Sequence, residues 1–184
     1  ETQRGIPNCV FLNAQNKQTI PTIMKPLRAL GIPAAGIYDI DFVKEGGATF
    51  SMYLEATVVP NLSRASIGVE RSEILKALQA TGKDFKRDGG INVLDVHERE
   101  AAQNFLDKLA SYGSFIVAGG ELESWLSHLA ATGHGPKWLI QVFEKMGEDP
   151  ESRGYLKPGN DDVWSFLDQI RIWSSDPNRK GIPN

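Results

Sequence analysis

A short apolar segment that ends in two closely spaced aspartates is the feature that most constrains the fold of this chain. The segment runs from Gly31 to Asp41 and reads GIPAAGIYDID. An apolar run of this length, bounded by glycine and proline, is typical of a buried strand. Residues two apart on a strand point to the same face, so Asp39 and Asp41 are predicted to lie side by side. Open α/β sheets bind ligands at the carboxyl ends of their strands, which is where this pair would lie.

The acidic pair, Asp39 and Asp41, has two interpretations. Two adjacent carboxylates repel each other, and a hard divalent cation such as Mg²⁺ neutralises them with oxygen ligands. Alternatively, the pair is a solvated strand end in which one aspartate caps the following helix. Because short D-x-D matches are common by chance, the spacing alone leaves both interpretations open.

The residues before the pair predict a strand–helix–strand unit, which is the building block of a parallel sheet. Cys9–Leu12 is a short apolar run and is predicted to be the first strand in this chain, with Cys9 in the core. Thr19 is predicted to cap the helix that follows. One apolar face of that helix is predicted to carry Ile23, Met24, Leu27 and Leu30.

The middle of the chain has few strand signals, and residues 45–112 are predicted to form a helical insertion after the second strand. Val69–Leu78 has the apolar spacing of a helix. Lys83–Gly90 is predicted to be a charged loop that ends in glycine. His97–Leu109 is a further amphipathic helix, whose apolar face is predicted to carry Ala101, Phe105 and Leu109.

A third strand and two further helices are predicted in the last part of the chain. Ser114–Ala118 is an apolar strand, and Pro136–Met146 and Asp161–Trp173 are helices, the last capped by Asn160 or Asp161. The core face of the last helix is predicted to carry Trp164, Leu167 and Ile170. Together these elements predict an α/β fold, with a mainly parallel, Rossmann-like sheet flanked by helices.

A second acidic pair follows the third predicted strand. Glu121 and Glu123 come directly after two glycines, and parallel strands would bring them to the same sheet edge as the first pair. Glutamates at a helix start are also favoured by the helix dipole, so capping is an alternative for this pair. Four converging carboxylates require cations, and two-metal sites for phosphoryl transfer are built in this way.

Two lysines are placed to act on a phosphate at this edge. Lys17 lies in the polar loop after the first predicted strand, and Lys137 lies at the start of the Pro136–Met146 helix. A lysine near a metal-bound phosphate stabilises the negative charge that develops during reaction. The alternative for each lysine is an ordinary solvated side chain.

Composition narrows the class of protein further. A formal net charge of −3 argues against a general electrostatic binder of polyanions, although it allows a local basic site. No apolar stretch has the length of a transmembrane helix. The single cysteine cannot form an internal disulfide, which is typical of a reducing compartment and predicts a cytoplasmic protein.

The three histidines are not spaced as zinc ligands. At the end of the sequence, the polar residues 174–184 are predicted to be an irregular surface tail.

Three motifs together are similar to those of one known family. NAQNK at residues 13–17 precedes a helix, LGIP at residues 30–33 leads to the D-x-D pair, and GELE occupies residues 120–123. In this combination the chain resembles the Toprim domain of OLD-family (overcoming lysogenization defect) nucleases, which are ATPase–Toprim proteins of bacteria and phages. The D-x-D pair is common to Toprim proteins, whereas GELE followed by a lysine is more particular to the OLD type. The resemblance extends from Val10 to Trp173 and implies a single Toprim domain over residues 1–184.

The resemblance implies a metal-dependent endonuclease that cuts DNA by a two-metal mechanism, with Mg²⁺ or Mn²⁺ as its two ions. By matching positions, Asp39 and Asp41 are the Toprim aspartates that hold metal, and Glu121 and Glu123 are the later acidic ligands.

The same resemblance assigns roles to the lysines and names partners. Lys137 corresponds to the lysine that supports the scissile phosphate, and Lys17 matches a family lysine of less defined role. The implied partners are DNA, an ATPase domain of the same polypeptide and a second copy in a homodimer. The implied setting is defence of bacteria against phages.

The chain departs from the Toprim pattern at one point. Toprim domains begin with a strand that ends in a glutamate, and no residue before Cys9 fits that strand. We expect the strand to lie upstream of residue 1.

The sequence is also compatible with two other functions. One is a non-catalytic Toprim-like module for dimerisation or DNA docking, and the other is a receiver-like or small-molecule phosphotransfer domain.

Overall fold

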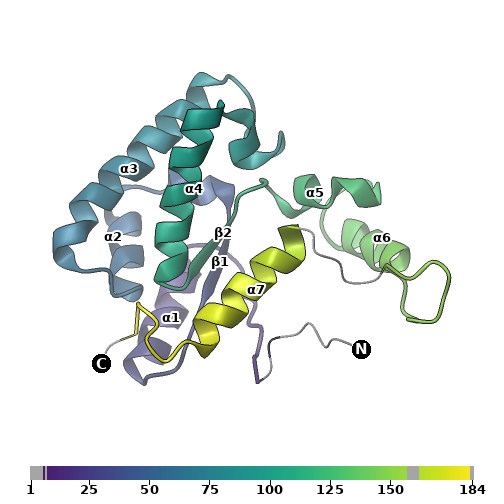
Figure 1. The fold of residues 1–184 in the computed structure, drawn as a ribbon, viewed down its shortest axis with the longest axis horizontal. Coiled ribbons are helices and arrows are strands. Elements are labelled where there is room, and N and C mark those ends of the chain that lie inside the picture. The colour runs from purple at the N-terminus through teal and green to yellow at the C-terminus, as the bar shows by residue number, and fades with distance from the viewer. Residues whose placement is uncertain (1–5, 7, 157–161, 183–184) are drawn as a thin grey trace.

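Two short parallel strands lie at the centre of a protein that is otherwise mostly helical (Figure 1). The computed structural model describes residues 6, 8–156 and 162–182. The strands are β1 (Gly36–Asp39) and β2 (Ser114–Val117). The α-helices are α1 (Thr19–Ala29), α2 (Gly47–Ala56), α3 (Asn61–Ala80), α4 (Val96–Ser111), α5 (Leu122–Trp125), α6 (Pro136–Met146) and α7 (Asp162–Ser175). The 3₁₀ helices of the described residues are η1 (Ile40–Lys44), η2 (Gly90–Val93) and η3 (Ser127–Leu129).

The two strands pair in parallel, with Gly36 opposite Ser114 and Asp39 opposite Val117. The connection between them contains α2, α3 and α4, so the paired strands are far apart in sequence. A long crossover of this kind is what parallel strands require. The predicted α/β class is therefore confirmed as a two-stranded parallel sheet flanked by helices.

The sheet lies between two hydrophobic clusters. Ile116 of β2 faces the larger cluster, which also contains Leu78 of α3 and Leu109 of α4. Phe115, its neighbour on β2, faces the smaller cluster with residues of α7. Successive strand residues point to opposite faces, which explains this division. The helices within residues 45–112 thus contribute to the same core as the strands.

Helices with a strong apolar period match the predictions from sequence. α6 has the predicted bounds, α3 contains Val69–Leu78, and α4 contains His97–Leu109. On α4, Phe105 is buried as predicted, but Ala102 is buried in place of the predicted Ala101, which is exposed. The predicted face was therefore wrong by one residue at this point, because two adjacent alanines give periodicity no basis for choosing between them.

The last helix follows the prediction where it is described. Leu167 and Ile170 of α7 pack in the smaller cluster, and Trp164 is partly buried. The predicted caps Asn160 and Asp161 lie outside the described residues.

The first predicted strand is wrong. Residues 9–12 form no strand, and Cys9 is exposed rather than packed in the core. The side chains of Val10, Phe11 and Leu12 are 80%, 69% and 63% exposed. An apolar run becomes a strand only where its backbone groups find a pairing partner, and the described residues provide none for this segment.

α1 buries a different set of residues from the predicted one. Met24 is buried as expected, but Leu30 lies just beyond the helix and is 77% exposed. Arg28 takes its place in the interior with 1% exposed. The predicted cap is also wrong, because Thr19 is the first helical residue and its N–H donates to Asn16 Oδ1 at 2.9 Å.

The buried guanidinium of Arg28 is surrounded by backbone carbonyls. It donates hydrogen bonds of 2.6 to 3.2 Å to four oxygens, those of Ala34, Tyr112, Gly113 and Gly181. Burial lowers the pKa of Arg28 to about 10, so the group stays charged at neutral pH. The described segment after α7 is irregular and mostly exposed, as predicted, but buried Gly181 anchors it on the body, and residues 174 and 175 belong to α7.

Alkaline pH is expected to weaken the main core through two tyrosines. Tyr38 of β1 and Tyr53 of α2 are buried edge to face, with 5.6 Å between ring centroids. Burial raises the pKa of both phenols well above the usual value. Below about pH 10 both phenols are protonated in the folded and the unfolded chain, and their burial contributes fully to the free energy of unfolding. Above that pH the unfolded chain releases the phenol protons and the folded chain keeps them, so this contribution is lost.

Urea unfolding of the wild type and Tyr53→Phe from neutral pH to about pH 11 measures this effect. Above about pH 10, the free energy of unfolding should fall with pH less steeply in the variant than in the wild type. The difference between the two slopes should be about 1.4 kcal/mol per pH unit. The lowered pKa of Arg28 acts in the opposite direction but is common to both proteins. Parallel declines in the two proteins would contradict the prediction.

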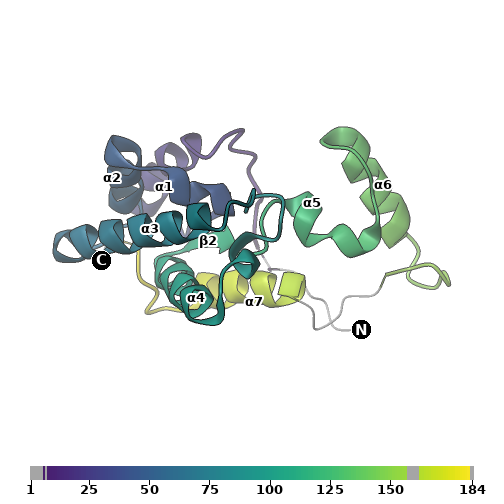
Figure 2. The same ribbon diagram turned by 90° about the horizontal axis from the view of Figure 1, so that it is seen from above.

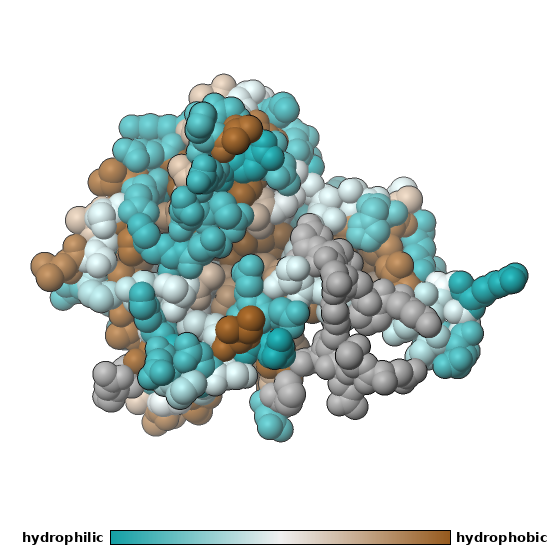
Figure 3. Space-filling model, viewed as in Figure 1, coloured by the Kyte–Doolittle hydropathy of each residue, from teal (hydrophilic) through white to brown (hydrophobic). Residues whose placement is uncertain are grey.

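α5 and α6 lie to one side of the body that the sheet and the other helices form, as Figure 1 and Figure 2 both show. On the face drawn in Figure 3, hydrophilic side chains predominate and the hydrophobic ones form separate patches. No helix in the described part of the chain combines the length and the apolarity that crossing a bilayer requires.

Candidate functional site

The two aspartates of the acidic pair converge, but not by the strand geometry predicted from sequence. β1 ends at Asp39 and the chain turns there into η1, so Asp41 lies in a 3₁₀ helix. Burial of Ile40 and Phe42 holds this turn against the core. Both carboxylates nevertheless face one ammonium group: Lys86 Nζ is 3.2 Å from Asp39 Oδ2 and 3.9 Å from Asp41 Oδ2.

Lys17 contacts the acidic pair from the other side. It lies in the turn before α1, next to Asn16, whose side-chain oxygen accepts a hydrogen bond from Thr19 N. Lys17 Nζ is 3.0 Å from Asp41 Oδ1 and 2.9 Å from Glu45 Oε1. Of the two lysines singled out from the sequence, Lys17 is therefore the one that the structure brings to the acidic pair.

Lys86 is a site residue that the sequence pattern does not reveal. It lies in the charged loop Lys83–Gly90, where a lysine is ordinarily solvated. The loop is fixed at two points, because Phe85 is buried and Lys86 O accepts a hydrogen bond from Glu121 N at 2.7 Å. A single phenylalanine within a charged loop is the local signal that its neighbour is held against the body.

Gly90 allows this loop to close on the turn that follows β2. Its φ is +64°, and a Cβ at this position would lie 1.7 Å from Ala118 O. The next residue, Ile91, donates its N–H to the same oxygen at 2.9 Å. The position of Lys86 therefore depends on a backbone contact that only glycine permits.

Replacing Gly90 by alanine is expected to lower the free energy of unfolding by about 2 to 5 kcal/mol, from left-handed backbone strain and overlap with Ala118. Gly82→Ala is the matched control, because Gly82 has a φ of +68° but nothing within 4 Å of its added Cβ. That variant should lose only the backbone contribution, about 1 to 2 kcal/mol. Urea unfolding compares the two, and equal losses would show that close packing at Gly90 is unimportant.

The charges at the acidic pair affect one another. Burial raises the pKa of Asp39, and the neighbouring Asp41 raises it further. Burial has the same effect on Asp41, but hydrogen bonds with Asp39 and Lys17 outweigh it and lower the pKa of Asp41. Burial lowers the pKa of Lys17 and Lys86, whereas their carboxylate partners raise it more, so both pKa values end above the usual one. Asp39 is thus the less stable anion of the pair, and added positive charge would favour its ionised form.

Glu121 lies at the rim of this site. It directly precedes α5, and its Oε1 is 3.9 Å from Arg87 Nε in the loop that carries Lys86. The charge of Glu121 contributes to the raised pKa of Lys86, so the two groups are within electrostatic reach of each other. Glu121 is therefore near the acidic pair without touching it.

Glu123 and Lys137 are placed differently. Glu123 Oε1 is 3.6 Å from His134 Nδ1, which lies just before α6. Lys137, in the first turn of α6, is exposed, and within the described residues its side chain forms no ion pair with the acidic pair. The structure therefore gathers Asp39, Asp41 and Lys17 but not these two residues.

The oxygen donors of the acidic pair fit a hard divalent cation. One ammonium already lies 3.2 and 3.9 Å from the Oδ2 atoms of Asp39 and Asp41, so a cation at that position contacts both carboxylates. Mg²⁺ is commonly held by one or two carboxylates together with waters and substrate phosphates, so a pair is sufficient. Among the described residues, no group of three or more His, Cys, Asp or Glu side chains is arranged to hold a metal ion. The pair fits one ion, and the second ion implied by the resemblance stays a prediction.

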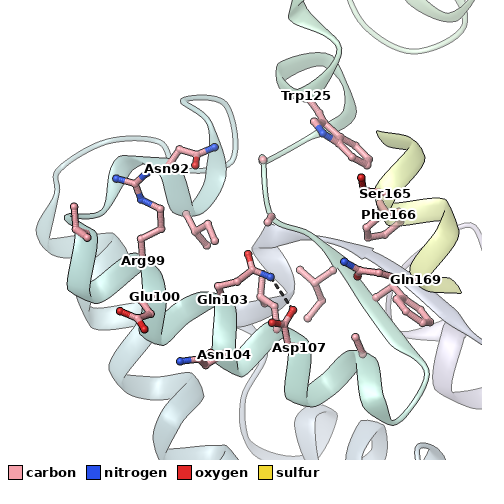
Figure 4. Close-up of a pocket in the computed structure, with 18 residues that line it drawn as sticks. Asn92, Arg99, Glu100, Gln103, Asn104, Asp107, Trp125, Ser165, Phe166 and Gln169 are labelled. Atoms are coloured by element: carbon pink, nitrogen blue, oxygen red, sulfur yellow. Dashed lines mark hydrogen bonds between the residues drawn. The ribbon is translucent and has the colours of Figure 1, made fainter. Parts of the chain in front are cut away.

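A separate cavity of about 640 Å³ lies against β2 between α4 and α7 (Figure 4). Trp125 and Phe166 line one side of it, and Gln103 and Asp107 of α4 line the other. Gln103 Nε2 donates a hydrogen bond of 2.8 Å to Asp107 Oδ1. Its described lining contains neither aspartate of the acidic pair. The cavity is therefore a different feature from the site at the end of β1.

Comparison with known proteins gives no relative for this chain. No protein-family model, no curated protein and no solved structure matches it.

Proposed function

We propose that this chain is a Toprim-like nuclease domain of the OLD type, which hydrolyses DNA with a divalent cation held by Asp39 and Asp41. One observation carries the proposal: two carboxylates at the end of a parallel strand direct their Oδ2 atoms at one shared cationic group. Open α/β sheets bind ligands at this position. The motifs that resemble OLD-family nucleases favour phosphodiester hydrolysis among the reactions of such a pair.

The residues around the pair prepare the place of the cation. When bound, the cation supplies an activated water and stabilises negative charge on the phosphate. Lys17 holds Asp41 through Oδ1, which leaves Oδ2 for the cation. Lys17 also pairs with Glu45, so it links Asp41, near the start of η1, to the residue that directly follows η1. The acidic pair is thereby oriented before any ligand arrives.

Positive side chains near the pair favour a phosphate as the substrate group. Lys86 and Arg87 follow each other in one loop and face Asp39 and Glu121. The chain has a net charge of −3, so attraction of DNA relies on this local group rather than on a generally basic surface. The roles of Glu123 and Lys137 belong to the proposal through the resemblance, and a direct role for them requires that α5 and α6 approach the pair.

An ATPase domain in the same polypeptide, a homodimer and a cytoplasmic location are further parts of this proposal, which the resemblance and the lone cysteine support. A second candidate is a non-catalytic Toprim-like module for dimerisation or DNA docking. It is favoured by the lysine contacts, because each aspartate already has an ammonium partner and is satisfied without metal.

Calorimetric titration with Mg²⁺ and Mn²⁺ tests the proposal. The wild type should bind at least one ion per chain, and the double variant Asp39→Asn/Asp41→Asn should bind none at the same concentrations, because both carboxylate ligands are removed. Far-ultraviolet circular dichroism checks that the variant is folded. Binding that survives in the double variant would exclude the acidic pair as the metal site and favour the non-catalytic module.

A further inference from the structure

We propose that Lys86 is a displaceable counter-cation, whose ammonium occupies the space between Asp39 and Asp41 until a divalent ion binds and then moves to the substrate phosphate. The inference rests on the proposed function, because it assumes that the acidic pair binds such an ion. It adds a regulatory element: the chain itself competes with the metal for the site.

The geometry separates the two lysines of the site by the oxygens that they contact. Lys17 approaches Asp41 at Oδ1, at 3.0 Å, and shares Glu45. Lys86 approaches the Oδ2 atoms of both aspartates, at 3.2 and 3.9 Å. Those two oxygens are the ones that a cation between the carboxylates would use. Lys86 therefore competes with the ion, whereas Lys17 supports one of its ligands.

The ammonium of Lys86 can leave without disturbing the loop that carries it. The backbone is held by the hydrogen bond from Glu121 N to Lys86 O and by the buried ring of Phe85. The side chain is 32% exposed, so a path to solvent is open. A lysine head group on four methylenes reorients at small conformational cost, whereas moving the fixed backbone would break several contacts.

The released ammonium has a place to go when DNA is bound. A phosphate next to the divalent ion offers oxygen acceptors within reach of the same side chain. The ion and the phosphate are then linked through Lys86, because each makes the binding of the other more favourable. Without a phosphate, the displaced charge remains close to the ion and weakens its binding by repulsion.

The dissociation constant of Mn²⁺, measured by calorimetry without DNA, tests the competition. Lys86→Met should bind Mn²⁺ at least about tenfold more tightly than the wild type, because a positive charge next to the dication is removed. Lys83→Met is the matched control, since it removes the same charge from an exposed position of the same loop. That variant should change the dissociation constant less than about twofold.

The outcomes separate this inference from the proposed function. Equal or weaker Mn²⁺ binding by Lys86→Met, with binding present in the wild type, would overturn the role of Lys86 and leave the metal site standing. Absence of Mn²⁺ binding from both proteins would overturn the proposed function, and the inference with it.

Chemical acetylation followed by mass spectrometry gives an independent measurement of the same movement. Lys86 should be acetylated several times faster when Mn²⁺ is added, because its ammonium no longer pairs with the carboxylates. Lys83 should react at the same rate in both conditions. An unchanged rate at Lys86 under saturating Mn²⁺ would show that the side chain stays in place and would overturn the proposal.

Discussion

Replacing Asp39 and Asp41 together by asparagine is expected to lower cation-dependent DNA cleavage by at least about 100-fold, since even the loss of groups that merely support metal ligands costs about 10- to 100-fold. Asparagine keeps the size of aspartate but removes both negative charges that hold the ion. The fold should survive, because the partly exposed ion pairs with Lys17 and Lys86 each contribute about 1 kcal/mol or less.

Cleavage is measured as nicking and linearisation of supercoiled plasmid in Mg²⁺ or Mn²⁺. Asp149→Asn/Asp168→Asn is the control, since it removes two negative charges from residues that have no contact with the acidic pair. The control should cut like the wild type. Undiminished cutting by a folded Asp39→Asn/Asp41→Asn protein would falsify the catalytic proposal.

Replacing Arg28 by methionine is expected to lower the free energy of unfolding by about 3 to 5 kcal/mol, a large part of the stability of a typical domain. The guanidinium is 1% exposed and donates to four backbone carbonyls, which methionine cannot do. The carbonyl of Gly113 keeps a second donor, Gly36 N at 3.0 Å, so the loss falls on the other three. Each carbonyl left without a donor in the interior costs about 1 to 3 kcal/mol before relaxation. The cationic group also lies 5.2 Å from the Trp173 ring, a contact that methionine keeps only in part.

Two variants calibrate the Arg28 measurement. Arg28→Lys keeps a positive charge but has one nitrogen in place of three, so its loss in urea unfolding should lie between those of the wild type and Arg28→Met. Arg171→Met removes an arginine that is paired at the surface with Asp168, and it should change stability by less than about 1 kcal/mol. A loss below about 1 kcal/mol for Arg28→Met would mean that the carbonyls find other donors.

Local patterns in the sequence predict the elements that depend on short-range order. The bounds of α6 and the course of α3 and α4 follow from apolar spacing, and the parallel pairing follows from two apolar runs separated by helices. The interior role of Arg28 does not follow in this way. Its acceptors include Gly181, which is 153 positions away, and helical periodicity predicts an apolar residue on the buried face.

At the candidate site too, local sequence patterns predict some residues, whereas others depend on contacts between distant segments. The acidic pair was visible as a D-x-D motif, although Asp41 reaches it through a 3₁₀ turn rather than through strand alternation. Lys86 was not visible, because its approach depends on Gly90 fitting against Ala118, a contact between segments that are distant in sequence. The family resemblance predicts Glu123 and Lys137 at the site, but Glu123 of α5 pairs with His134 and Lys137 lies in the first turn of α6.

The contact between Arg28 and Gly181 has a consequence for biosynthesis. During translation, α1 leaves the ribosome long before residue 181, so the guanidinium lacks one of its four acceptors until that residue has been added. Closing a loop of this length is entropically unfavourable and slows folding. The nascent chain therefore stays incompletely folded until residue 181 is available, and a chaperone that shields it over this interval would raise the yield of native protein.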